Sequence, residues 1–268
     1  MSPQVFAILN VTPDSFSDGG QFENADEAVA RGIELMAQGA HIVDVGGEST
    51  RPGAERVDPD EEQARVLPVI RGLVAAGVPV SIDTMNSVTA LAAAEAGASV
   101  INDVSGGLAD PEMYRVVAQT KLLYIAMHWR GHSADMDSLA VYDDVVTDVR
   151  TELKARLAEM FVWGVEKEQV VLDPGLGFAK TAEHNWQLLG RLDELASLGH
   201  PLLIGASRKR FLADVLPEGA SKTDRDLPTA VVGAFAAQAG VWALRVHDVA
   251  STRTALNVVD AWKAGRGR

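Results

Sequence analysis

Eight short apolar runs alternate with helix-like segments along the whole chain, and no linker or low-complexity stretch interrupts the alternation. Continuous apolar runs of this length are typical of parallel strands that are buried on both faces. The pattern predicts an α/β fold, a TIM barrel of (β/α)8 type, in a single domain over residues 1–268. The expected strands are residues 6–11, 41–45, 78–83, 100–103, 122–127, 170–173, 202–205 and 243–246.

A doubly wound open sheet is the competing α/β architecture. Such a sheet normally carries a glycine-rich dinucleotide-binding turn after its first strand. Here the first run continues into Asn10-Val11-Thr12-Pro13, which is not such a turn. The barrel is therefore the preferred interpretation.

Two helix starts can be placed from capping patterns. Asp58 precedes Pro59, and acids fill the following turn, as is typical of a helix N-terminus. Asn24, with Glu27 three residues later, resembles a capping box, so we expect the first helix to begin near Asn24.

Composition excludes several classes of function. The chain has no cysteine, which rules out a disulfide framework, a thiolate zinc site and a cysteine nucleophile. Acidic residues outnumber basic ones 37 to 24, and the net charge of −13 would repel nucleic acid. No apolar stretch approaches the roughly 20 residues of a membrane span, and the first ten residues show no signal-peptide pattern. We expect a cytoplasmic protein that acts on small molecules, with neither nucleic acid nor membrane as a partner.

Polar side chains follow almost every expected strand. In a TIM barrel the C-terminal strand ends converge on one bowl, which holds the active site. One such residue is most often a helix cap, but a whole ring of them indicates a polar site. The ring contains Asn10, Glu48, Ser49, Thr50, Arg51, Asp83, Asn102, Asp103, His128, Asp173, Ser207, Arg208, Lys209, Arg210, Arg245, His247 and Asp248.

Two strand-to-helix connections on the same barrel face are long. Residues 12–23 and 46–57 both exceed the two to six residues that are usual for such joints. Both contain glycine and polar residues, so we expect them to act as lids over the bowl.

The polar residues divide by charge. Asp83, Asn102 and Asp173 offer acceptors and an amide, which suit a flat heterocycle rich in N–H donors. Cations gather after the seventh and eighth strands, the recurrent phosphate site of this fold, and indicate an anionic substrate or leaving group. These cations are Arg208, Lys209, Arg210, Arg245 and His247. For a metal, Mg²⁺ held mainly by substrate phosphates and one protein oxygen fits better than zinc.

The strand-end blocks resemble those of the dihydropteroate synthases, the pterin-binding enzymes of folate biosynthesis. The resemblance covers the whole chain in order, and its first two blocks are long enough to be highly specific. The blocks are Leu9-Asn10-Val11-Thr12-Pro13-Asp14-Ser15-Phe16-Ser17-Asp18-Gly19-Gly20, Gly46-Gly47-Glu48-Ser49-Thr50-Arg51-Pro52-Gly53, Ile101-Asn102-Asp103-Val104-Ser105-Gly106-Gly107, Leu172-Asp173-Pro174-Gly175 with Gly177-Phe178, Ser207-Arg208-Lys209 and Arg245-Val246-His247-Asp248. Met127-His128-Trp129-Arg130 and Arg210-Phe211 are most similar to actinobacterial members.

The resemblance implies a transferase that condenses 6-hydroxymethyl-7,8-dihydropterin diphosphate with p-aminobenzoate, giving 7,8-dihydropteroate and pyrophosphate. It also implies Mg²⁺ as cofactor and a homodimer. Electrostatic stabilisation would carry the reaction, because positive charge develops on the pterin methylene and negative charge on the leaving pyrophosphate. No covalent nucleophile is needed.

The same resemblance assigns roles to individual residues, with Asp83, Asp173, Lys209, Arg245 and His247 as the catalytic set. Asp83, Asn102, Asp173 and Lys209 would hold the pterin, and Met127 and Phe178 would line its slot. Asn10, Arg245 and His247 would hold the diphosphate, with Asn10 as the metal ligand and Ser207 among the substrate-binding residues. Phe16, Thr50, Arg51 and Pro52 would frame the p-aminobenzoate pocket. Arg210 departs from the family pattern, because many members have a small hydroxyl residue there.

Two other readings compete with this one. A pterin-dependent methyltransferase would share the barrel and the acidic pterin pocket but would have no use for the cations after strands seven and eight. A non-catalytic pterin-binding relative would be favoured by loss of Lys209, Asp173 or the first loop, and all of these are present.

Overall fold

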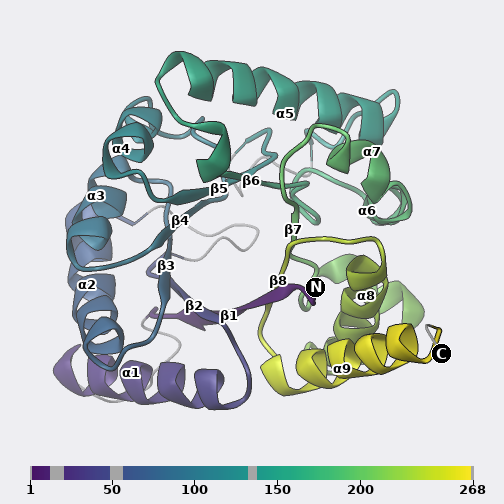
Figure 1. Cartoon of the computed structure of the whole chain (residues 1–268), viewed down its shortest axis with the longest axis horizontal. Coiled ribbons are helices and arrows are strands. Elements are labelled where there is room, and N and C mark those ends of the chain that lie inside the picture. The colour runs from purple at the N-terminus through teal and green to yellow at the C-terminus, as the bar shows by residue number, and fades with distance from the viewer. Residues whose placement is uncertain (1, 13–20, 49–56, 132–137, 267–268) are drawn as a thin grey trace.

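The computed structural model describes residues 2–12, 21–48, 57–131 and 138–266. Its eight parallel strands form one sheet in the order β6-β5-β4-β3-β2-β1-β8-β7. The two edges of this sheet meet at a parallel bridge between Leu172 and Leu202, where the Leu172 N–H donates to Pro201 O over 2.9 Å. The strands therefore close into a barrel with helices around it, which confirms the predicted fold (Figure 1). The strands are β1 Gln4–Asn10, β2 Ile42–Gly46, β3 Val80–Asp83, β4 Val100–Asp103, β5 Leu123–Met127, β6 Val170–Asp173, β7 Leu203–Ile204 and β8 Ala243–Val246.

The helices fill the connections between strands. Among the described residues, no helix combines the length and apolar character that a bilayer crossing requires. The α-helices are α1 Gln21–Ala37, α2 Pro59–Ala75, α3 Ser87–Glu95, α4 Met113–Thr120, α5 Val145–Val162, α6 Ala182–Gly190, α7 Leu192–Ala196, α8 Asp226–Gln238 and α9 Val249–Arg266. Within the described ranges there are also short 3₁₀ segments, η2 Lys167–Gln169, η3 Arg210–Val215 and η4 Thr223–Arg225.

One predicted helix start is confirmed and the other is wrong. Asp58 caps α2, and its side chain accepts from the Asp60 N–H over 2.9 Å. Helix α1 already begins at Gln21, so Asn24 lies inside its first turn instead of capping it. Adding residues to a formed helix requires little free energy compared with nucleating it, so an internal capping pattern does not force the helix to begin there.

Alternation along the strands places the functional side chains. Phe6, Val100, Ile125, Val171, Leu203 and Ala243 form a buried cluster of their own inside the barrel. Their neighbours in sequence, such as Val5, Ile101 and Leu172, belong to the larger cluster under the helices. Because side chains point to opposite faces at successive positions, the inward register continues past the inner cluster to the strand ends. There the apolar side chains give way to polar ones.

Candidate active site

A cavity of about 720 Å³ lies at the C-terminal ends of the strands. That volume falls within the usual range for small-molecule sites. Ten of the predicted site residues lie in the described ranges, and all ten line this cavity. They are Asn10, Asp83, Asn102, Met127, Asp173, Phe178, Ser207, Lys209, Arg245 and His247. The other four, Phe16, Thr50, Arg51 and Pro52, lie outside the described residues.

A buried ionic network forms the floor of the cavity. Arg245 on β8 donates through Nε to Asp44 Oδ2 and through Nη2 to Asp83 Oδ2, each over 2.5 Å. Asn102 Nδ2 donates to the same Asp44 oxygen over 3.1 Å. Burial raises the pKa of Asp83 to about 7 against the opposing attraction of Arg245. Burial also opposes the charge of Arg245, but Asp44 and Asp83 hold its pKa above the ordinary value.

Asp44 is a member of this network that sequence reasoning missed. It is fully buried, and its Oδ1 has no hydrogen-bond partner among the described residues. A signal was present, because Asp44 is the one charged residue in the apolar run of β2 and lies two positions before Gly46, on the same inward face. A buried charge in a strand needs a partner, and here that partner is Arg245, a long way along the chain.

Asp173 and Lys209 lie beside one another in the wall and influence each other electrostatically. Asp173 Oδ1 accepts from the Gly175 N–H over 2.7 Å. The ammonium of Lys209 donates to Leu176 O and lies 4.7 Å from the centre of the Phe178 ring. Burial raises the pKa of Asp173, partly offset by Lys209. Burial likewise lowers the pKa of Lys209 to about 8, with Asp173 opposing the shift.

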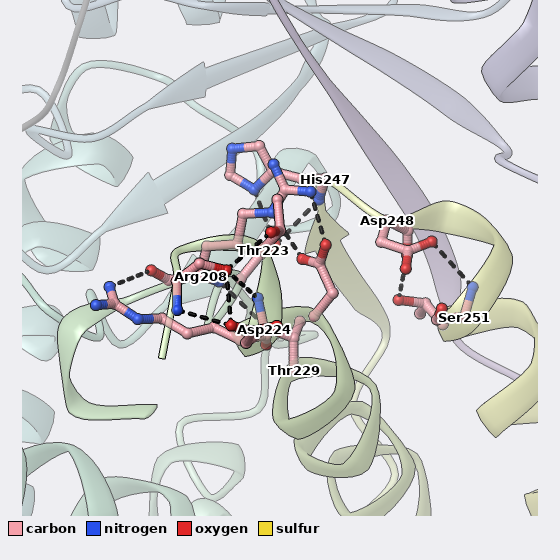
Figure 2. Close-up of polar contacts among 12 residues, drawn as sticks. Arg208, Thr223, Asp224, Thr229, His247, Asp248 and Ser251 are labelled. Atoms are coloured by element: carbon pink, nitrogen blue, oxygen red, sulfur yellow. Dashed lines mark hydrogen bonds and ion pairs between the residues drawn. The ribbon is translucent and has the colours of Figure 1, made fainter. Parts of the chain in front are cut away.

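His247 is held in place by Ser207. Ser207 Oγ lies 2.9 Å from His247 Nδ1 and accepts from the His247 backbone N–H over 3.0 Å. This arrangement leaves Nε2 as the imidazole nitrogen that points away from Ser207. Figure 2 shows His247 among the polar contacts at this end of the barrel.

Arg208 is tied down by protein groups. Its guanidinium donates to both oxygens of Asp226 at 2.7 Å, and its N–H donates to Thr229 Oγ1 over 3.2 Å (Figure 2). It adopts a left-handed backbone conformation with φ of 58°. The predicted cation cluster after strands seven and eight is therefore partly neutralised by acids. Arg208 pairs with Asp226, and Arg245 pairs with Asp44 and Asp83.

Two acids of the predicted ring have structural roles. Asp103 points outward and accepts from the N–H groups of Ser105 and Gly107 and from the hydroxyls of Ser105 and Tyr124. Asp248 Oδ1 accepts from the Ser251 N–H over 3.0 Å at the start of α9 (Figure 2). The helix-cap interpretation of strand-end acids is therefore right for Asp248, whereas Asp103 stabilises the turn that follows β4.

A metal would have to be held largely by its ligand. Among the described residues, no group of three or more His, Asp or Glu side chains could bind a metal ion. Asn10 is a cavity-lining oxygen donor near Asp83, since a side chain built on Gly46 would meet Asn10 Oδ1 at 3.7 Å and Asp83 Oδ2 at 3.5 Å. One amide oxygen beside an open cavity fits Mg²⁺ that arrives on a diphosphate.

Comparisons with known proteins agree with this geometry. The sequence profile of the pterin-binding enzyme family, described as "Pterin binding enzyme", matches residues 6–247. This chain belongs to that family. The dihydropteroate synthase of Mycobacterium leprae is 50% identical over 264 residues, which cover 97% of this chain and 93% of that protein. An actinobacterial relative of this similarity confirms the resemblance, and within the family the chain falls among the dihydropteroate synthases, which are transferases.

Solved structures of family members have the same barrel. The Xanthomonas albilineans dihydropteroate synthase with 4-aminobenzoic acid is 42% identical and matches with a TM-score of 0.91, covering 98% of this chain and 94% of that one. The same enzyme in complex with 7,8-dihydropteroate matches at 39% identity with a TM-score of 0.88 and the same coverage of both chains. The fold and the family assignment therefore rest on near-complete overlap.

Proposed function

We propose that this protein condenses 6-hydroxymethyl-7,8-dihydropterin diphosphate with p-aminobenzoate, forming 7,8-dihydropteroate and releasing pyrophosphate. The observation that carries the proposal is the convergence of ten predicted site residues on one cavity at the strand ends. The ligands of the X. albilineans structures, 4-aminobenzoic acid and 7,8-dihydropteroate, support it, because they are a substrate and the product of this reaction.

The pterin occupies the deep part of the cavity in this proposal. Asp173 keeps one oxygen for the Gly175 N–H and presents the other to the pterin's amine and ring N–H groups. Asn102 and Asp83 contribute further polar groups from β4 and β3, and Met127 and Phe178 line the two faces of the ring. These acceptors match a heterocycle whose edge is rich in N–H donors.

The diphosphate faces the strand ends that carry His247, Arg245 and Asn10. The C–O bond to the diphosphate breaks with its electron pair leaving on oxygen, the arylamine nitrogen bonds to the methylene carbon, and that nitrogen loses a proton. His247 and Arg245 stabilise the leaving charge, and Asp83 and Asp173 stabilise the cation-like methylene. When bound, Mg²⁺ would neutralise charge on the diphosphate, and Asn10 would hold it.

Other parts of the assignment rest on the resemblance alone. The p-aminobenzoate contacts expected from Phe16, Thr50, Arg51 and Pro52 stay predictions, as do loop closure, the cytoplasmic location and the homodimer. Arg210, at the departure from the family pattern, lines the cavity and so lies where it can meet a substrate.

The decisive experiment measures pyrophosphate release by the full chain with both substrates and Mg²⁺. We expect release that depends on p-aminobenzoate and on the pterin diphosphate, and dihydropteroate formation in equal amount. Binding of hydroxymethyl pterin without any pyrophosphate release would instead identify a non-catalytic pterin-binding protein.

A further inference from the structure

The connection between β6 and α6 forms one wall of the pterin slot and has an unusual backbone. Gly175, Gly177 and Ala179 all have positive φ, at 69°, 76° and 48°. For the two glycines this conformation is unstrained, but for Ala179 it is disfavoured. Strain of this kind persists only where the surroundings over-determine the backbone. Something must therefore hold the loop at Ala179.

Lys180 is the side chain placed to hold it. It is only 8% exposed, burial lowers the pKa of its amine to about 7, and it lines the cavity. Its Nζ donates to Phe178 O over 3.0 Å, across the strained residue, and lies 2.9 Å from His128 Nδ1. The aromatic ring of the same Phe178 covers the Lys209 ammonium at 4.7 Å. Lys180 thus fixes the backbone of the residue that covers a pterin-binding lysine.

A chain of partners that runs from the buried His128 toward the surface fixes Lys180 in turn. His128 is 2% exposed, and its Nε2 lies 2.9 Å from Glu152 Oε2. Burial opposes the charge of Glu152, but hydrogen bonds to His128 and Arg130 outweigh burial and lower the pKa of Glu152 to about 2, so this carboxylate accepts from Nε2–H. In the neutral ring Nδ1 is then the acceptor for Lys180. Burial, reinforced by Lys180, lowers the pKa of His128 to about 4, in keeping with a neutral ring. Arg130 closes the chain by donating to Glu152 Oε1 from Nη2 over 2.5 Å.

We propose that Lys180 is a positioning residue for the pterin slot: it anchors the strained loop at Phe178 and so keeps that ring against Lys209. This proposal rests on the proposed function, because it names a further residue on which pterin recognition depends. Lys180 acts through Phe178 and Lys209, so its loss affects pterin recognition first. The arylamine side of the site, which the resemblance places on other loops, is unaffected.

The test compares Lys180→Met with the parent in the full chain. We expect the Kd for 6-hydroxymethyl-7,8-dihydropterin, measured by calorimetry, to rise about tenfold or more. The KM for the pterin diphosphate should rise similarly, while the KM for p-aminobenzoate at saturating pterin diphosphate should change less than about twofold, within the scatter of such constants. Lys167→Met, which removes an exposed lysine at the start of η2, is the matched control and should change none of these three constants.

A second substitution separates anchoring from a general loss of packing. Glycine at position 179 removes the left-handed penalty of Ala179, so Lys180→Met/Ala179→Gly should recover about fivefold of the lost pterin affinity. A loss of packing alone would not be repaired by removing a methyl group.

If Lys180→Met melts before it can be assayed, His128→Gln tests the same chain. The glutamine amide can replace Nε2 toward Glu152, and no atom replaces Nδ1, so pterin affinity should still fall at least about threefold. Unchanged pterin affinity in Lys180→Met, or no recovery in the double variant, would overturn the proposal. Absence of pyrophosphate release by the parent would instead overturn the proposed reaction and leave the calorimetric comparison intact.

Discussion

Asp173 is the residue whose replacement tests the pterin placement most directly. An asparagine that keeps the Gly175 N–H bond must place its NH₂ group at the present position of Oδ2. A side chain built on Gly205 would meet Asp173 Oδ2 at 3.5 Å and the Lys209 ammonium at 3.9 Å, so that oxygen and Lys209 face the same small space. In the variant this NH₂ donor therefore faces two other donors, the Lys209 ammonium and the N–H groups of the pterin.

We expect Asp173→Asn to bind the pterin about tenfold to a few hundredfold more weakly, because such a mispaired buried group costs about 1–3 kcal/mol. Turnover should fall further, since the carboxylate also stabilises the cation-like methylene. Calorimetry with a thermal melt measures both effects, and Asp193→Asn on α7 is a control for an exposed acid. Affinity within threefold of the parent would show that Asp173 does not contact the pterin.

His128 gives a prediction about pH at the same scale. Its pKa is lowered by burial to about 4 in the folded protein, from an ordinary value of 6.5. Between these values the unfolded chain binds the extra proton, so the stability present above pH 6.5 is lost as the pH falls toward 4. Asp83 titrates in the opposite sense, because its raised pKa of about 7 makes the folded state bind protons first. The contribution of His128 is therefore obtained by comparing the pH dependence of the free energy of unfolding in the parent and in a variant without this histidine.

His128→Gln should flatten the acid side of the stability curve. Relative to the parent, its free energy of unfolding should fall by about 3 kcal/mol less between pH 6.5 and pH 4. Urea denaturation at several pH values measures this difference. Parallel curves for the two proteins would mean that folding does not lower the pKa of His128.

At the scale of elements, the periodicity of the sequence predicts where strands lie but not which side chains contact one another. The strands β4, β6 and β8 match their predicted bounds residue for residue. The inward ring of polar residues followed from the same alternation. The alternation did not identify Asp44 or Lys180 as site residues. Asp44 contacts Arg245, and Lys180 contacts His128 and Phe178, and only folding brings these partners together.

Loop geometry was also beyond the sequence. The β6–α6 connection approaches β5 so closely that a side chain at Gly175 would lie 2.2 Å from His128 O, a backbone atom. Gly175 also has φ of 69°. Gly77 shares the positive φ, at 76°, but a side chain there would meet nothing within 4 Å. Replacing each glycine by alanine therefore distinguishes the cost of backbone strain, present at both positions, from the cost of a close contact, present only at Gly175.

Gly77→Ala should therefore reduce the free energy of unfolding by about 1 kcal/mol, the strain term alone. Gly175→Ala should reduce it by about 3 kcal/mol or more, because the His128 carbonyl must also move. Urea denaturation of both variants gives the comparison. Equal losses would mean that the loop can withdraw from β5 and so accommodate the methyl group.

For the whole molecule, basic side chains and exposed apolar side chains gather in different places, the first at the cavity and the second on the outer helices. The net charge of −13 does not extend to the cavity, whose lining has seven lysine and arginine side chains, Lys180, Lys209 and Arg245 among them, against three acids, Asp83, Asp173 and Asp214. An anionic substrate therefore meets local cations in an acidic protein. Apolar surface, by contrast, gathers outside the barrel on α8 and α9, which pack side by side (Figure 1).

This apolar surface is where we expect the predicted homodimer to form. On α8, Leu227, Val231 and Phe235 recur every fourth residue and are 71%, 46% and 68% exposed. On α9, Val258 and Trp262 are 61% and 63% exposed. Large apolar side chains at helical spacing on adjacent helices are typical of a protein interface, since monomers seldom expose contiguous apolar surface.

The parent should sediment at twice the chain mass of 28.5 kDa in analytical ultracentrifugation at micromolar concentration. Phe235→Lys places a charge in this surface and should shift the protein to monomer, because an unpaired charge is expensive to bury. Val162→Lys is the control, since Val162 is 87% exposed at the end of α5, across the barrel from α8 and α9 (Figure 1). A dimer that survives Phe235→Lys would place the interface elsewhere. A parent that sediments as a monomer at every concentration would rule the dimer out and leave these side chains as ordinary exposed surface.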